Sequence, residues 1–157
     1  KSRVAVGLSV AAVKQREFAQ RFGFRDYEVV TGFASAYWAT PFNNYDMAIH
    51  VGRYLAKDVG ATFELRRTFR SGWQVGAWAT LTDVPFEQFG EGSFDKGLFF
   101  QIPLEVLFAG GRSNIATRLR PMQRDGGARL EDYAGNIFWS LRGARYDAFK
   151  LDERLVP

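Results

Sequence analysis

The sequence contains no cysteine, a single histidine and only five prolines among its 157 residues. Without cysteine the chain has no disulfide framework, no thiolate metal site and no cysteine nucleophile. A single histidine, His50, cannot form the histidine cluster that binds zinc, and we assign it no role. We therefore expect no cofactor and no metal site.

Strong net charge and long apolar runs are missing as well. Lys and Arg number 21 against 17 Asp and Glu, a net charge of +4 that is too small to indicate a nucleic-acid partner. The longest uncharged stretch, Val29 to Tyr45, contains Pro41 and Asn43, so it does not resemble the run of about 20 apolar residues of a membrane-spanning helix. Because the chain begins at Lys1 rather than at Met, we expect it to be a piece of a longer protein.

The sequence is rich in aromatic residues, and its apolar and polar side chains alternate with a period of two. Aromatic residues make up 16% of the chain, which also holds 16 glycines. In the segment from Ala61 to Arg70, Phe63 and Leu65 alternate with Glu64 and Arg66. This alternation is typical of β-strands that expose one apolar and one polar face, and it predicts an all-β protein.

Turn residues separate the alternating segments, as at Pro41–Asn44, Lys57–Gly60 and Arg70–Gly72. The spacing predicts an antiparallel up-and-down meander of about seven strands. We place these strands near residues 3–16, 26–40, 45–57, 60–70, 73–84, 96–108 and 114–121. Residues 1–121 thus form the β-segment, and residues 122–157 are a charged turn and a C-terminal tail of the same domain. In the tail, Ile137 and Leu141 are four residues apart, which is a helical spacing and favours a short helix. The alternative is an irregular tail.

The length of the first three strands favours part of an outer-membrane β-barrel over a soluble sandwich. Soluble strands usually have about 5–6 residues, whereas strands that cross a membrane need roughly 9–11. The face that carries Leu98, Phe100, Ile102, Leu104 and Val106 is then expected to face lipid. Aromatic residues near the strand ends suit the interfacial girdle of such a barrel, and the alternative is that they are core residues of a soluble sheet. They are Tyr27, Tyr37, Trp38, Tyr45, Tyr54, Phe69 and Trp73.

Polar side chains on the opposite face are candidates for contact with a polysaccharide in a barrel lumen. Arginine guanidinium groups bind carboxylates and hydroxyls, and tryptophan stacks on sugar rings. The candidate lumen contacts are Arg66, Arg70, Trp78, Gln101, Glu105, Arg118, Arg120, Arg124 and Arg129. The alternative is that these arginines pair with Glu64 and Glu105 across strands and only keep the interior polar.

The acidic residues Glu87, Glu91 and Asp95 suggest either a calcium-binding loop or a pair of carboxylates for acid/base catalysis. Their spacing lacks the carboxylates at every second position that a calcium loop requires, and it does not define two carboxyl groups across a cleft. We expect all three to be solvated loop charges, and we identify no catalytic residue in the sequence.

Three blocks of the sequence resemble the YjbH/GfcD family of exopolysaccharide and group 4 capsule proteins of Gram-negative bacteria. The blocks are GRYLAKD at 52–58, GWQVGAWATLTDVPFEQFGEGSFDKG at 72–97 and RPMQRDGGARL at 120–130, and they lie in stretches that cover roughly half of the chain. The resemblance implies that the chain is a C-terminal segment of a large outer-membrane barrel lipoprotein. It carries over no catalytic or binding residue.

We therefore expect a non-enzymatic component of exopolysaccharide or capsule export or assembly in the outer membrane of a Gram-negative bacterium. Its partners would be polysaccharide, outer-membrane lipid, the remainder of the barrel chain and periplasmic export proteins. The alternative is a soluble periplasmic β-domain that binds saccharide or a partner of the export system. A third possibility, a barrel-shaped hydrolase, has no catalytic constellation to support it.

Overall fold

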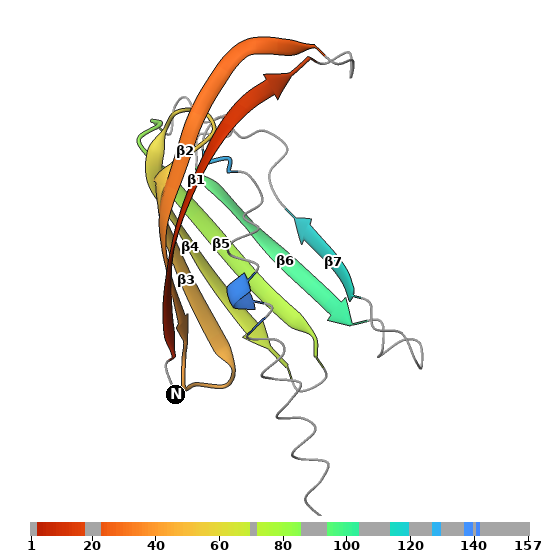
Figure 1. Ribbon diagram of the computed structural model, residues 1–157. Helices are drawn as coiled ribbons and strands as arrows, with labels where there is room; N and C mark the ends of the chain where they lie inside the picture. The colour runs from red at the N-terminus through yellow and green to blue at the C-terminus, as the bar shows by residue number, and fades with distance from the viewer. Residues whose placement is uncertain are drawn as a thin grey trace, which may run out of the picture.

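A computed structural model describes residues 3–17, 23–69, 72–85, 94–103, 114–119, 127–129, 137–139 and 141, and for residues 103 and 114–119 it describes the backbone alone. The described residues form seven strands (Figure 1). The strands are β1 (Val4–Arg16), β2 (Phe24–Ala39), β3 (Tyr45–Arg53), β4 (Val59–Thr68), β5 (Gln74–Thr82), β6 (Asp95–Pro103) and β7 (Asn114–Leu119).

The seven strands make one antiparallel sheet in the order β1-β2-β3-β4-β5-β6-β7, which confirms the predicted meander. Each strand pairs with the next one along the chain, as in the pairing of Ile49 with Phe63 across β3 and β4. The sheet is curled, and β1 and β7 lie at its two edges (Figure 1).

The turns explain where the strands end, and in one case why a strand ends earlier than the alternation predicts. The turn between β2 and β3 places Asn43 and Asn44 at positive φ angles, which asparagine tolerates better than bulkier residues. Strand β3 stops at Arg53 because the backbone turns back at Tyr54, whose N–H donates to the Asp58 carbonyl at 2.8 Å. The predicted extension of the sixth strand to residue 108 lies outside the described residues.

The two faces of the sheet differ in chemistry because the side chains alternate. The convex face carries apolar side chains, and on β1 these are Val6, Leu8 and Val10, with 82%, 83% and 80% of their surface exposed. The same face carries Met47, Phe63, Leu65, Leu81 and Leu98 on other strands, all exposed. The prediction that Leu98 and Phe100 share this outward face is confirmed by their register with β5, and Ile102 follows them two residues on along β6, whereas Leu104 and Val106 lie outside the described residues.

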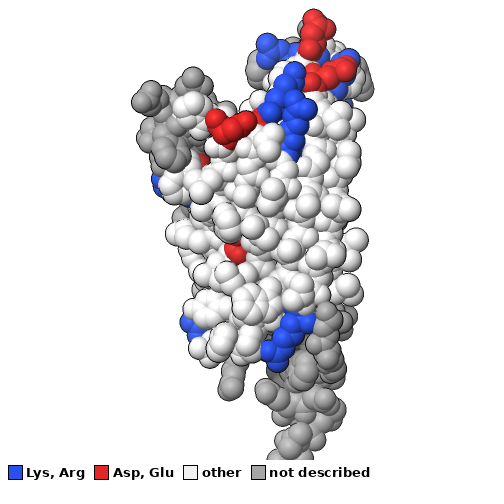
Figure 2. All heavy atoms as spheres, turned by 90° about the vertical axis from the view of Figure 1, so that its left-hand side faces the viewer, with Lys and Arg blue, Asp and Glu red and all other residues white. Residues whose placement is uncertain are grey.

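Figure 2 shows the convex face over the first strands as a broad, almost uncharged band between charged ends, with a small acidic patch near its middle. At one end lie Lys14, which bonds Glu28 at 2.6 Å, and Arg53. At the other end lie Arg3 and Arg67. The apolar band therefore runs along the strands from one charged rim to the other.

The aromatic residues near the strand ends divide between the two faces. Trp38, Phe69 and Trp73 are exposed near the lower ends of β2, β4 and β5, and the Arg67 guanidinium lies 4.7 Å from the Phe69 ring centroid. Tyr37 and Tyr54 are buried on the concave side, so the prediction that they belong to an outer girdle is wrong. Position near a strand end sets a residue's height in the sheet, but alternation sets its side.

Residues 137–139 and 141 are helical and lie inside the curl of the sheet (Figure 1). The side chain of Phe138 stacks on Tyr37 with ring centroids 4.6 Å apart. Among the described residues there is no helix with the length and apolarity needed to cross a membrane.

Candidate functional site

The concave face of the sheet is lined by polar side chains that are shielded from water. Most of them lie on β2 to β6, at positions that alternate with the apolar convex residues. The buried polar residues are Thr31, Ser35, Asp46, His50, Asp58, Thr62, Thr80 and Asp95. Because buried polar groups need hydrogen-bond partners, their contacts define what this face can do.

His50 on β3 is joined to Ser35 on β2 by a 2.8 Å hydrogen bond between its Nδ1 and the serine Oγ. The Tyr37 ring packs edge-on against the imidazole, with centroids 5.5 Å apart. Asp46 lies on the same face of β3, but four residues along the strand, which is a separation of about 13 Å. Ser35, His50 and Asp46 are therefore not spaced as a catalytic triad.

Three hydroxyl groups form a chain across the upper part of the concave face. Tyr54 Oη lies 2.6 Å from Thr62 Oγ1, which in turn lies 2.8 Å from Thr80 Oγ1. Burial raises the pKa of the Tyr54 phenol above its usual value of 10.0, since the phenolate would lose its hydration. The chain links β3, β4 and β5 through side chains in addition to the backbone ladder.

Residues 127–129 dock against the turn between β3 and β4. The Gly127 N–H donates to Asp58 Oδ2 at 2.7 Å, and the Leu55 N–H donates to the Ala128 carbonyl at 2.8 Å. We call these two hydrogen bonds the Asp58–Gly127 clasp. Gly127 has a φ angle of 71°, and a Cβ at this position would lie 2.8 Å from Cγ2 of Thr80. The clasp thus requires glycine, because the backbone conformation and the close approach both exclude a side chain.

Asp95 begins β6 and is only 2% exposed, so the prediction that it is a solvated loop charge is wrong. Its Oδ2 accepts a hydrogen bond of 3.2 Å from the indole Nε1 of Trp78 on β5. The carboxylate is drawn inward because the strand starts at Asp95 and its side chain falls on the concave face. Glu87 and Glu91 lie outside the described residues.

Arg66 on β4 is held among aromatic rings and polar partners. Its Nη2 lies 2.9 Å from Glu64 Oε1, and its Nη1 donates to Gln74 Oε1 at 3.2 Å. The guanidinium carbon lies 3.8 Å from the centroid of the Trp139 ring and 4.8 Å from that of Phe99. Such a guanidinium is fixed in place by stacking and by a charge pair.

The structure places four of the predicted lumen contacts on or at the concave face. Trp78 and Gln101 alternate with outward residues on β5 and β6, Arg66 lies on β4, and Arg129 Nη2 lies 4.0 Å from Glu64 Oε2. The backbone of Arg118 pairs with that of Phe99. Arg70, Glu105, Arg120 and Arg124 lie outside the described residues.

The structural alternative for the arginines was a pair with Glu64 across strands, whereas the structure pairs Arg66 with Glu64 within β4. Both residues lie on the same strand, two positions apart, so their side chains leave the same face.

Sequence reasoning missed the residues through which the C-terminal segment contacts the sheet. Asp58 was assigned to a turn, and Phe138 and Trp139 received no contact with the sheet. The two-residue alternation gives no information on which distant segment covers the polar face. One available signal was the resemblance itself, since its blocks at 52–58, 72–97 and 120–130 supply Asp58, Asp95 and Gly127, which lie together in the fold.

The concave face holds residues 127–129 and 138–139 of the same chain through a carboxylate, a guanidinium group, backbone groups and aromatic rings. No group of three or more potential metal ligands occurs among the residues that the structure describes.

The fold and this site define a class of protein: a curled antiparallel β-meander with an apolar convex face and a polar concave face. Residues 1–142 match the YjbH family, whose description reads exopolysaccharide biosynthesis protein YbjH, and the chain belongs to this family. It is also 42% identical over 135 residues to an uncharacterized lipoprotein, YjbH, of Escherichia coli (strain K12). That match covers 82% of this chain but 19% of the relative, so the chain spans about a fifth of the relative's length. No solved structure matches the chain.

Proposed function

We propose that this chain forms part of the wall of an outer-membrane β-barrel that takes part in the export or assembly of an exopolysaccharide or capsule without catalysing a reaction. The barrel belongs to a lipoprotein of a Gram-negative bacterium. Its other partners are the remainder of the barrel chain, which completes the wall, and periplasmic export proteins.

The observation that carries the proposal is the inverted distribution of side chains. Leu8 and Val10 are among the most exposed apolar residues on the convex face, while Asp58 and Thr62 are buried on the concave face. A soluble sheet packs its apolar face on a core, whereas a membrane barrel exposes that face to lipid and keeps polar residues inside. The second arrangement accounts for both faces at once.

The height of the apolar band fits the same interpretation. On β3 and β4 the band extends from Tyr45, which pairs with Arg67, to Arg53, which pairs with Val59. Eight residue steps of about 3.3 Å give about 26 Å along the strand, and a tilt of roughly 40° shortens this to about 20 Å. Membrane barrels have an outward apolar band of about 25 Å with aromatic residues at its edges. Trp38, Phe69 and Trp73 occupy such an edge here.

Exopolysaccharide enters the proposal through the family to which the chain belongs. A polar concave face fits the inside of a water-filled barrel lumen, which a hydrated polymer can enter. The spacing of Ser35, His50 and Asp46 supports a non-enzymatic role, since it does not match that of a nucleophile, a base and an orienting carboxylate.

Two arginine substitutions on one strand test the membrane placement. Phe63 and Val59 both lie on the convex face of β4, with 51% and 52% of their surface exposed, but Phe63 is in the middle of the band and Val59 at its charged rim. An arginine at mid-membrane depth on a lipid-facing strand costs about 2–4 kcal/mol, and one near the interface costs about 0–1 kcal/mol. Phe63→Arg should therefore reduce assembly of the full-length protein in the outer membrane, and Val59→Arg should not.

Equal tolerance of the two substitutions would contradict the proposal, because half-exposed positions in water accept arginine with little cost. Extraction supplies a second test. A barrel wall stays with the membrane fraction until detergent is added, whereas the alternative of a soluble periplasmic β-domain that binds saccharide predicts release into aqueous buffer.

A further inference from the structure

The hairpin of β1 and β2 extends well beyond the strands beside it. Pairing between β2 and β3 begins at Gly32 and Arg53, so residues 24–31 of β2 continue past the end of β3. In Figure 1 the two strands arch over the end of the curled sheet where the turn between β3 and β4 lies. The hairpin end is therefore placed at the mouth of the concave face.

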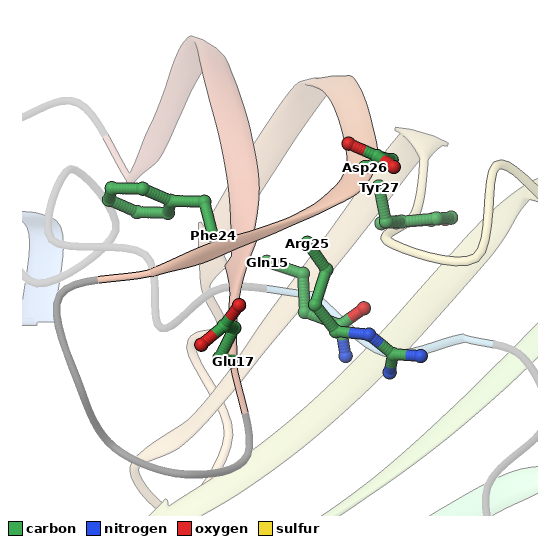
Figure 3. A pocket seen from close by; sticks show the side chains of 6 residues that line it. All are labelled: Gln15, Glu17, Phe24, Arg25, Asp26 and Tyr27. Carbon is green, nitrogen blue, oxygen red and sulfur yellow. The ribbon is translucent and has the colours of Figure 1, made fainter.

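A hollow opens in this overhanging part, and Figure 3 shows the six side chains around it. We call it the rim hollow. It is lined by Gln15, Glu17, Phe24, Arg25, Asp26 and Tyr27. These six residues are distinct from the buried polar residues of the concave face.

An irregularity in the strand pairing coincides with the rim hollow. Lys14 pairs with Glu28 and Arg16 pairs with Phe24, so Arg25, Asp26 and Tyr27 lie opposite Gln15 alone. Such a bulge interrupts the alternation of side chains and redirects them, and bulges are frequent beside binding sites. Here it brings the side chains of three consecutive β2 residues to one hollow.

Tyr27 gives the hollow a fixed aromatic wall. Its hydroxyl donates a hydrogen bond to the Leu55 carbonyl in the turn between β3 and β4, and the Lys57 ammonium lies 5.1 Å from its ring centroid. Phe24 supplies a second aromatic ring, which is exposed. The Tyr27 wall is therefore in place before any ligand binds, which lowers the entropy cost of binding.

The polar groups of the hollow have mixed hydrogen-bonding character. Glu17 and Asp26 accept, Arg25 donates, and the Gln15 amide does both. The two carboxylates and one guanidinium do not favour a strongly anionic ligand. A neutral sugar ring has hydroxyls around its edge and C–H groups on its faces, and it matches acceptors, donors and aromatic walls together.

The concave face offers less access to a polymer than its polarity suggests. Arg66 is enclosed by Glu64, Gln74 and Trp139, and Trp78 bonds Asp95, so these predicted contacts are already engaged within the protein. We propose that the rim hollow binds a neutral sugar unit of the exopolysaccharide at the mouth of the barrel. This inference rests on the proposed function and names the residues that meet the polymer.

Binding to the full-length protein in detergent tests the proposal. The probe is a set of oligosaccharides made by partial acid hydrolysis of the exopolysaccharide of the bacterium that carries the protein, and the dissociation constant is measured by calorimetry. Asp26→Asn removes a charged acceptor and Phe24→Ala removes an aromatic wall. Each should weaken binding about tenfold, which is the effect of losing one charge-assisted hydrogen bond or one ring contact.

Glu28→Gln is the matched control, because Glu28 lies next to the hollow on β2, pairs with Lys14 and does not line the hollow. Its dissociation constant should stay within about twofold of the wild-type value. The proposal is overturned if the wild-type protein does not bind the oligosaccharides, or if both Asp26→Asn and Phe24→Ala bind as tightly as the wild type. Secretion of the polymer and assembly in the membrane are measured separately. Normal secretion without oligosaccharide binding would reject the sugar site but not the proposed role in export.

Discussion

Gly127 is a residue at which one added methyl group should disturb the concave face. Its φ angle of 71° costs an L-residue about 1–2 kcal/mol, and a Cβ would meet the Thr80 side chain at 2.8 Å. Gly127→Ala should lower the free energy of unfolding of the full-length protein by about 1–3 kcal/mol, as measured by urea titration in detergent. Gly7→Ala is the control, because a Cβ there meets only Tyr37 at an ordinary 3.8 Å. An equal effect of both substitutions would argue against the clasp.

Single residues also show what alternation predicts and what it leaves open. The placement of Trp78 toward the polar interior follows from its position between Gly76 and Thr80, and the structure agrees. The burial of Asp95 could not be foreseen, because it depends on the residue at which a loop becomes a strand. Strand boundaries are set by turns and long-range pairing, so they are poorly determined by local pattern.

At the scale of elements, the contact between β2 and the helical residues 137–139 is open to a direct measurement. Tyr37 and Phe138 stack with ring centroids 4.6 Å apart and an interplanar angle of 22°. A double-mutant cycle with Tyr37→Leu and Phe138→Leu should give a coupling energy of about 0.5–1.5 kcal/mol in unfolding experiments on the full-length protein. A cycle between Phe138 and Phe63, which lie on opposite faces of the sheet, should be additive. Coupling near zero in the first cycle would mean that the helical residues do not dock as described.

The strands themselves were largely predictable, and the reason is physical. A sheet with different surroundings on its two faces forces a period of two on the sequence, as in Phe63 and Leu65 against Glu64 and Arg66 on β4. The docking of residues 127–129 was not predictable, because their contacts with Asp58 and Thr80 depend on side chains far apart in the sequence. The bulge opposite Gln15 was likewise not predictable, because the alternation of apolar and polar residues does not show it.

At the scale of the whole molecule, the open edges of the sheet determine how the chain behaves by itself. The strand order leaves β1 and β7 as edges, and β1 presents 13 residues along which another strand can add. Residues 1–142 expressed without the rest of the protein should therefore associate through these edges, giving oligomers in detergent by light scattering. The full-length protein is the control and should be monodisperse. A monomeric fragment would indicate that the edges are protected.

The clasp between Asp58 and Gly127 also fixes an order of events during folding. The two residues are 69 positions apart, and the surface that receives Gly127 includes Thr80 on β5 and Asp95 on β6. We expect the segment to find its site only after β3 to β6 have paired, because contacts between distant residues form late when loop closure is costly. On this expectation the sheet pairs first and the segment covers its polar face afterwards. During biogenesis that face would then be exposed to water until residues 127–129 dock.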